Sequence, residues 1–250
     1  MARLLWCMLW LMLQPLPLCA QSAPPLVLNT YAGPPFSTAD QQGYYDQILR
    51  EAFRRLGVPV VIGQLPAERS LLNADRGIDD GDFVRIAGLE KRYPNLVMVP
   101  EKIDEFEFVA FTRRLNLETS DWSALAPYHV AIVRGWKILE ENLAGVRQLS
   151  KVDNQEQLFT LLQRDRVDAV VYSRKEGHAL LWRLGITDGV ALEPPLASRP
   201  MYLYLNRKHQ ALVAPLAAIL KRMKTDGTVA AIGRRTLTLF LPAEAPGAHR

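Results

Sequence analysis

The sequence predicts an α/β fold in which two lobes, joined by extended strands, form a hinged clamshell. Short apolar segments typical of strands alternate with segments whose apolar residues recur every three or four positions, as on one helix face. This alternation normally produces mostly parallel sheets covered by helices. The apolar segment 106–112 suits a buried strand that crosses between lobes. Periodicity alone also allows a single doubly wound sheet.

The first twenty residues have the pattern of a secretory signal peptide and are not expected to join the fold. Arg3 precedes the apolar run 4–13, and the segment ends at the small residue Ala20. A membrane-spanning helix needs roughly 18 apolar residues, so this run is too short. We expect cleavage near Ala20 and a periplasmic protein. A lipid-modified Cys19 is the alternative, which the bulky Leu18 before it disfavours.

Composition excludes several classes of protein. The 250 residues are 49% hydrophobic and 22% charged, as in globular proteins rather than disordered or fibrous ones. Both cysteines, Cys7 and Cys19, lie in the predicted signal peptide, so no disulfide is expected in the mature chain. The net charge is +4, but the basic residues are scattered without interleaved aromatics, so no nucleic-acid binding is expected. No other segment is apolar enough for stable membrane insertion.

Turn and helix-stop signals set the elements of the first lobe. The segment 33–36 makes a turn after the first strand, and a helix with one apolar face then runs to Leu56 and ends at Gly57. A second short helix is expected at 67–76. The predicted strands are 25–31, 58–62, 82–86 and 96–99.

A second α/β series follows, and the chain then returns. Asp153 or Asn154 is available as a helix N-cap. The predicted strands are 129–133, 146–149, 167–172 and 201–205, and the predicted helices are 137–144, 155–164, 175–184 and 210–224. Residues 242–250 are expected to form a loose tail. We expect the first lobe to comprise 21–110 plus 203–241, and the second 111–202.

Short motifs occur in a characteristic order along the chain. They are GPPFS at 33–37, GYYD at 43–46, RSLL at 69–72, DDGDF at 79–83, VAIVRG at 130–135, RVDAVV at 166–171 and KTDGT at 224–228. The ordered set resembles the extracellular solute-binding proteins of family 3, the periplasmic receptors of polar amino acid ABC transporters. The resemblance implies a type II periplasmic-binding-protein-like clamshell that closes on a small solute at the hinge. It further implies a monomer without a cofactor, partnered by an ABC permease or a membrane sensor.

The resemblance directs attention to arginines of the first lobe. Family members hold a ligand carboxylate with an arginine, since a guanidinium matches it with two parallel hydrogen bonds. Phe83 and Arg85 lie near the end of a predicted strand. Ligands of open α/β sheets bind at strand ends, so both residues are candidate ligand contacts. The alternative for Arg85 is a surface arginine paired with Glu90. Arg92 lies closer to the family's arginine position, and Arg69 can face either the cleft or solvent.

Aromatic residues and the second lobe supply further candidates. Phe36 follows the Pro-Pro turn and can pack on a ligand or in the core. Arg134 and Trp136 follow a predicted buried strand, where backbone N–H groups at a helix start favour anions. We therefore include all three among the expected ligand-binding residues.

The residues after the strand at 167–171 depart from the family pattern. Members commonly place an aspartate there for the ligand's amino group, whereas this chain has Tyr172 and Ser173, both candidate ligand contacts. A ligand ammonium thus lacks an obvious counter-charge. We expect a small polar or anionic metabolite, with an amino acid as one option.

The alternative function is a periplasmic dehydratase or lyase on the same fold, with Glu68 or Glu90 as its acid. The four histidines show no metal-ligand spacing, and no nucleophile elbow or phosphate loop is present. The acidic residues Asp79, Asp80 and Asp82 are better explained by a turn than by a cation site. We therefore predict a non-enzymatic solute-binding protein with no catalytic residue and no metal.

Overall fold

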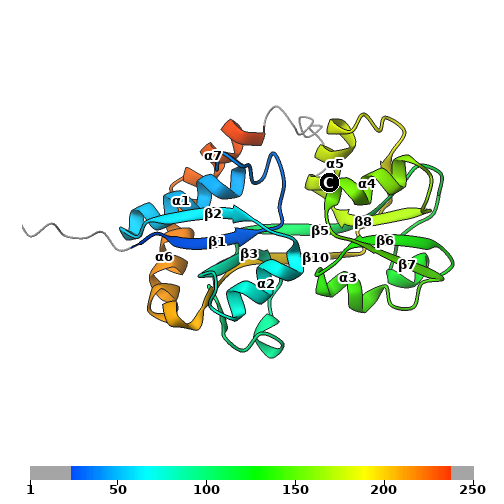
Figure 1. The fold of residues 1–250 in the computed structure, drawn as a ribbon. Helices are drawn as coiled ribbons and strands as arrows, with labels where there is room; N and C mark the ends of the chain where they lie inside the picture. The colour runs from blue at the N-terminus through cyan, green and yellow to red at the C-terminus, as the bar shows by residue number, and fades with distance from the viewer. Residues whose placement is uncertain (1–23, 238–250) are drawn as a thin grey trace, which may run out of the picture.

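The computed structural model describes residues 24–237, so the predicted signal peptide and the expected tail at 242–250 lie outside them. Two lobes lie side by side and are linked by long strands (Figure 1). The first lobe opens with β1 (Leu26–Thr30), α1 (Tyr44–Leu56), β2 (Val60–Gln64), α2 (Ala67–Asp75), β3 (Gly81–Arg85), the 3₁₀ helix η1 (Leu89–Lys91) and β4 (Leu96–Met98).

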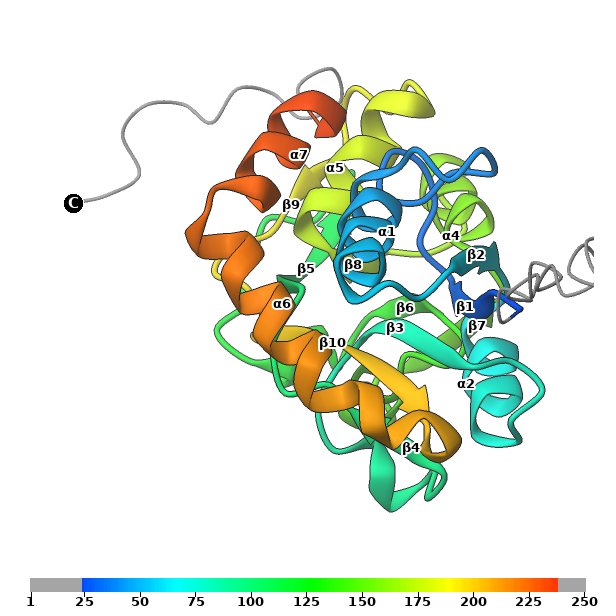
Figure 2. The same ribbon diagram turned by 90° about the vertical axis from the view of Figure 1, so that its left-hand side faces the viewer.

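β5 (Asp104–Thr112) leads into the second lobe and β10 (Ala197–Asn206) returns from it. The second lobe contains η2 (Trp122–Leu125), β6 (His129–Val133), α3 (Lys137–Asn142), β7 (Gln148–Val152), α4 (Gln155–Gln163), β8 (Ala169–Ser173), α5 (Arg174–Arg183) and β9 (Val190–Ala191). The chain then completes the first lobe with η3 (Arg207–Leu212), α6 (Val213–Thr225) and α7 (Thr228–Leu237). Both of these α-helices pack against α1 (Figure 2). No helix within residues 24–237 is long and apolar enough to cross a membrane.

Three strands in each lobe pair in parallel, and β5 and β10 pair antiparallel with their neighbours. β1 pairs with β2 and β3, and β6 pairs with β7 and β8, all in parallel. β10 pairs antiparallel with β5 through residues 197–201 and with β3 and β4 through residues 202–206. The predicted two-lobed α/β fold with crossing strands is therefore confirmed, in preference to a single doubly wound sheet.

The crossing points lie near the predicted lobe boundaries. β10 changes partner between Met201 and Tyr202, and β5 changes from β10 to β8 at Phe108. The predicted changes of lobe fall after residues 110 and 202. That division of the chain stays a prediction.

Several expected strands begin a few residues away from those observed, and two of these differences have a visible cause. The strand expected at 146–149 lies at 148–152, because the Val146 N–H donates to the Leu143 carbonyl in a turn that follows α3. The strand expected at 201–205 begins at Ala197, because its first residues pair with β5 in a polar stretch that lacks the apolar signal of a buried strand. β6 forms over the predicted residues.

The expected helix 210–224 is shorter than predicted, and a further helix follows it. Residues 207–212 form a 3₁₀ helix with non-helical backbone at His209, so α6 begins only at Val213. Gly227 has a φ of 79°, which ends α6, and the chain turns and starts α7 at Thr228. The sequence predicts no element for residues 228–237, so α7 is an additional helix.

A buried carboxylate fixes the turn that leads into α1. Asp46 accepts hydrogen bonds from the Ser37 hydroxyl at 2.7 Å, the Thr38 N–H at 2.9 Å and the Gly43 N–H at 3.0 Å. Asp46 and Ser37 are both fully buried. Burial raises the pKa of Asp46, and the three donors oppose that rise. A side chain of the following helix thus ties together residues 37, 38 and 43 of the turn.

We predict that Asp46→Ala lowers the free energy of unfolding by about 3 kcal/mol, because it leaves several buried donors without an acceptor. Urea unfolding at neutral pH measures the change. The exposed Asp40 accepts from Thr38 in the same turn, and Asp40→Ala is the matched control, with little expected effect. Equal losses in the two variants would contradict this role for Asp46.

Candidate functional site

Arg85, the last residue of β3, is buried in an internal ion pair rather than exposed. Its Nε donates to Asp82 Oδ2 at 2.8 Å and its Nη2 to the Ala67 carbonyl at 2.8 Å, and its guanidinium lies 4.8 Å from the Tyr31 ring centroid. The alternative prediction, a surface Arg85 paired with Glu90, is therefore wrong. Burial raises the pKa of Asp82 to about 6 although Arg85 opposes this. Arg85 is therefore already matched by a carboxylate.

A chain of aromatic rings runs between the lobes. Tyr31, which follows β1, meets Trp136 of the second lobe edge-on at a centroid distance of 5.0 Å. Trp136 stacks on Tyr172 at 4.5 Å and contacts Phe108 of β5 at 5.8 Å. All four rings are buried. The lobes thus meet through stacked aromatic faces, with Arg85 at one end of the chain.

The lobes also approach each other through backbone. Gly135 precedes Trp136 with a φ of 89°, and a Cβ built there would lie 2.6 Å from the Glu68 nitrogen of α2. The Lys137 ammonium forms an ion pair with the Glu68 carboxylate across the same contact, and the Tyr93 hydroxyl donates to Glu68 at 3.2 Å. No side chain can be inserted here while the lobes stay closed.

The cavity left between the lobes is small. Its volume is about 30 Å³, and Tyr31, Arg85, Phe108, Trp136 and Lys137 are among its lining residues. A water molecule needs roughly 10–15 Å³ of such volume, whereas small-molecule pockets have about 300 Å³ or more. In this conformation the space between the lobes has no room for a small molecule, which could enter only if the lobes moved apart.

Five buried side-chain polar atoms within residues 24–237 have no hydrogen-bond partner. They are Ser70 Oγ, Asp82 Oδ1, Trp136 Nε1 and both carboxylate oxygens of Glu176. Buried polar groups are normally satisfied, so each exception asks for an explanation. Trp136 lies in the turn after β6 and Glu176 at the start of α5, where the second lobe faces the first, whereas Ser70 and Asp82 are buried inside the first lobe.

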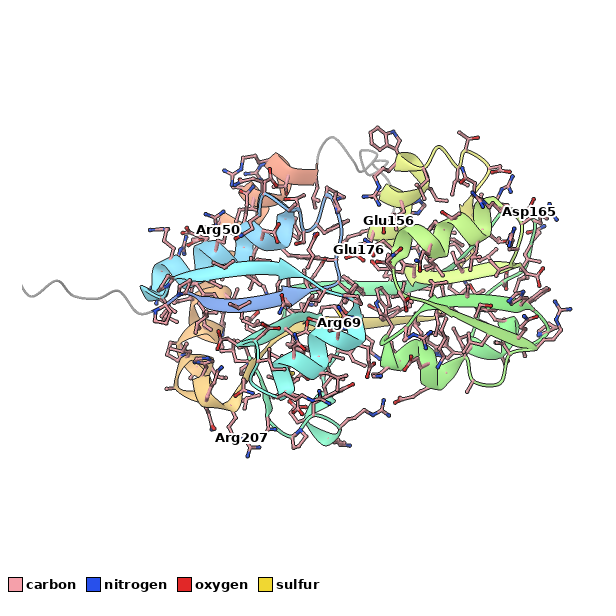
Figure 3. All side chains as sticks on the ribbon, viewed as in Figure 1. Arg50, Arg69, Glu156, Asp165, Glu176 and Arg207 are labelled. Atoms are coloured by element: carbon pink, nitrogen blue, oxygen red, sulfur yellow. The ribbon has the colours of Figure 1, made fainter. Side chains whose placement is uncertain are left out.

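Glu176 lies in the first turn of α5, on the side of the second lobe that faces the first (Figure 3). Its side chain is buried. Burial raises its pKa to about 8, the nearby charge of Asp104 adds to the rise, and the Tyr172 hydroxyl and Lys175 oppose it. Burial and the Glu176 charge also raise the pKa of Tyr31 and Tyr45 of the first lobe.

The structure brings together some of the residues predicted for the site and separates others. Arg85, Trp136 and Tyr172 meet between the lobes, and Ser173 is buried at the adjoining end of β8. Four other candidates lie elsewhere: Phe36 packs on Tyr45, Phe83 is core within β3, Arg69 is exposed on α2, and Arg134 is exposed beside Asp153.

Arg92 is also exposed and forms an ion pair with Glu141 of the second lobe at 3.2 Å. The acidic triplet has three separate sets of partners: Asp79 accepts from Asn73, Asp80 pairs with Lys208 and His209, and Asp82 pairs with Arg85. No group of three potential metal ligands occurs among residues 24–237.

Sequence reasoning missed Tyr31 and Glu176. The candidates predicted after this strand are Tyr172 and Ser173, whereas the buried carboxylate lies three residues further along, at Glu176. The available signal was an acidic residue three positions after Ser173, because one turn of a helix that starts there returns the side chain to the strand end. Tyr31 had been assigned only as the end of a strand.

Comparison with known proteins establishes the fold. No family model matches the chain. A protein of Shewanella oneidensis, described as uncharacterized, is 27% identical over 215 residues, 83% of this chain and 80% of that protein. A histidine kinase sensor domain with similarity to periplasmic binding proteins superposes with a TM-score of 0.75 at 19% identity, covering 86% of this chain and 97% of its own.

Two further solved structures are similar. The GluR0 ligand-binding core in complex with L-glutamate has a TM-score of 0.75 at 14% identity, covering 86% of this chain and 99% of its own. A mutant of ArgBP from T. maritima has a TM-score of 0.71 at 19% identity, covering 85% and 95%. This chain therefore has a two-lobed periplasmic-binding-protein-like fold, and these similar structures are binding or sensor domains rather than enzymes.

We predict that Arg85→Ala lowers the free energy of unfolding by about 3 kcal/mol, because it leaves the buried Asp82 carboxylate without its cation. Urea unfolding measures the loss, and the double variant Asp82→Leu with Arg85→Met should recover most of it. Arg54→Ala, which breaks an exposed ion pair with Glu51, is the control and should change stability little. An Arg85→Ala protein as stable as wild type would show that the pair is not structural.

We further predict that wild-type stability falls relative to Glu176→Gln as pH rises from about 4.5 to about 8. In this window the folded protein keeps a proton on Glu176 that the unfolded chain has released, so unfolding becomes easier with rising pH. Groups facing Glu176 are Tyr172, Lys175, Asp104, Tyr31 and Tyr45, which both proteins share. Thermal unfolding of both across this range measures the difference, and parallel curves would refute it.

Proposed function

We propose that this protein binds a small solute between its two lobes and presents the closed form to a membrane partner. The observation that carries the proposal is that Trp136 and Glu176, buried where the lobes meet, have side-chain polar atoms with no hydrogen-bond partner among residues 24–237. A ligand with hydrogen-bonding groups of its own would satisfy them.

Closure around a solute is a population shift in this proposal. A ligand that contacts both lobes would favour a form in which the lobes lie close together over one in which they lie apart. β5 and β10 are the connections about which the lobes would open. Tyr31 and Arg85 from the first lobe, and Trp136, Tyr172 and Glu176 from the second, would then border the open cleft.

The partner and compartment follow from the same proposal. The apolar N-terminal segment favours export to the periplasm, with cleavage near Ala20 and lobes divided as the sequence predicts. The similar structures include a sensor domain and the substrate-binding protein of an amino acid ABC transporter. Either an ABC permease or a membrane sensor is therefore a fitting partner, and a small polar metabolite such as an amino acid is a fitting ligand class.

We propose no enzymatic role. Glu68, one of the two acids considered for a dehydratase or lyase, forms an ion pair with Lys137 and accepts from Tyr93. In this proposal Glu68 joins the two lobes through these contacts and does not transfer a proton. The other acid, Glu90, lies in η1.

The backbone contact at Gly135 gives a direct test of closure. We predict that Gly135→Ala prevents full closure, because its Cβ would collide with the α2 backbone. In a thermal-shift screen of amino acids, carboxylates and amines, a bound compound should then raise the unfolding temperature of wild type but not of this variant. Small-angle X-ray scattering with a stabilising compound should show compaction only in wild type.

Gly88→Ala is the matched control. Gly88 has a φ of 90°, so alanine there suffers the same backbone strain, but no atom lies within 4 Å of its Cβ position. Gly88→Ala should therefore keep the ligand response. Loss of the response in both variants, or in neither, would contradict closure through Gly135. Turnover of a stabilising compound would favour the enzymatic alternative.

A further inference from the structure

We propose that a basic groove at the surface, where α2 meets the second lobe, docks an acidic peptide segment of the membrane partner. The groove takes its cations from both lobes: Arg69 and Arg76 from the first, and Arg134 from the second. The proposal rests on the proposed function and locates the surface by which the partner recognises the closed form. It also gives a role to Arg69 and Arg134, two predicted ligand contacts that do not line the cavity between the lobes.

The walls of the groove come from the two lobes. Arg69, Asn73 and Arg76 are among the residues that line it from the first lobe, and Asp153 lines it from the second. Arg134 belongs to the same wall, because its Nε lies 3.4 Å from Asp153 Oδ1. Figure 3 shows Arg69 at the end of α2 nearest the second lobe. The groove therefore has this form only while the lobes lie close together, so a partner bound in it distinguishes closed lobes from open ones.

Two cations of the groove are not neutralised by the protein. Arg69 and Arg76 are exposed, and neither forms an ion pair with a carboxylate within residues 24–237. Glu68, which also lines the groove, is already paired with Lys137 of the second lobe. The groove thus keeps two positive charges that attract a carboxylate from another molecule.

The remaining carboxylates near the groove have partners of their own. Asp153 pairs with Arg134, but the distance of 3.4 Å exceeds the roughly 2.7–2.9 Å of a strong charge-assisted hydrogen bond, so Arg134 keeps donors for a second carboxylate. Asp79 accepts from the Asn73 amide at 2.7 Å, and Asp75 accepts a backbone N–H at 3.0 Å. Neither Asp75 nor Asp79 lines the groove.

The shape and the apolar content of this surface favour a peptide over a lipid membrane. The groove has a volume of about 510 Å³, which admits the side chains of a narrow segment, whereas a membrane surface fits a flat or convex face better. Ile78 is 65% exposed, and its N–H donates to the carbonyl of Asn73 at the groove. Protein interfaces combine arginines with apolar contacts of this kind.

The spacing of the two arginines indicates the kind of segment that fits. Arg69 and Arg76 are separated by two helical turns, so they lie on one side of α2 and about 10 Å apart along its axis. An extended peptide rises about 3.3 Å per residue, so carboxylates about three residues apart can reach both guanidinium groups. We therefore expect an extended segment with several acidic residues.

Fluorescence anisotropy with a labelled octapeptide of glutamate tests the surface, with an octapeptide of serine as the uncharged probe. We expect wild type to bind the glutamate probe and not the serine probe. Arg69→Glu with Arg76→Glu should bind the glutamate probe at least about 10-fold more weakly, because attraction becomes repulsion. Arg134→Glu alone should also weaken binding, since the second lobe supplies that cation. Added salt should weaken wild-type binding.

A matched variant separates this groove from general positive charge. Arg50→Glu with Arg164→Glu makes the same change in net charge at two exposed arginines, one in α1 and one directly after α4. It should bind the glutamate probe as wild type does, and thermal unfolding checks that every variant is folded. Equal weakening in this variant and the groove variants overturns the proposal. Failure of wild type to bind the probe, or unchanged binding in Arg134→Glu, also overturns it.

Vesicles of phosphatidylglycerol test the other class of anionic surface. Cosedimentation of wild type that is lost in Arg69→Glu with Arg76→Glu, without binding of the glutamate probe, overturns the peptide assignment in favour of a lipid surface.

Failure of the groove and failure of the proposed function are distinguishable. If the groove proposal fails but a compound of the thermal-shift screen stabilises and compacts wild type, the solute-binding function stands. If no compound of the screen stabilises or compacts wild type, the solute-binding function fails, whatever the groove binds.

Discussion

Desolvation of charge where the two lobes meet is the constraint on which the site depends. Asp82 and Arg85 are buried in β3 of the first lobe, and Glu176 is buried at the start of α5 in the second. Asp82 and Arg85 compensate each other through a direct ion pair, so they can be buried permanently as part of the first lobe. Glu176 has no such partner, and its burial raises its pKa to about 8. The closed form is thus stable only with that carboxyl protonated or paired.

The fold explains how these groups come together. Parallel strands in each lobe direct their carboxyl ends toward the other lobe, so β1, β3, β6 and β8 deliver Tyr31, Arg85, Gly135 and Tyr172 to one place. β5 and β10 join the lobes without an intervening flexible linker. The chain therefore needs only two crossing strands to make one site from residues far apart in sequence.

The sequence predicted the fold better than the site, for identifiable reasons. Apolar periodicity and Gly57 place α1 closely, and the run before Arg134 places β6, because local rules decide both. Arg85 was found from its place at a strand end, but its partner Asp82 was not, because pairing depends on side-chain direction within a buried strand. Glu176 was missed because its exposure depends on how the first turn of α5 faces the other lobe. No local sequence pattern predicts the contact between the first turn of α5 and the first lobe.

The glycine contact sets how closely the two lobes can approach each other. Main chain touches main chain at Gly135 and Glu68, so the closed geometry has a fixed end point that no rotamer change can adjust. In the proposed function, a molecule slightly too large for the cleft would keep these two segments apart even when one lobe held it firmly. Such a molecule would occupy the site without producing the lobe arrangement that the proposed partner recognises, and so would act as a competitive antagonist.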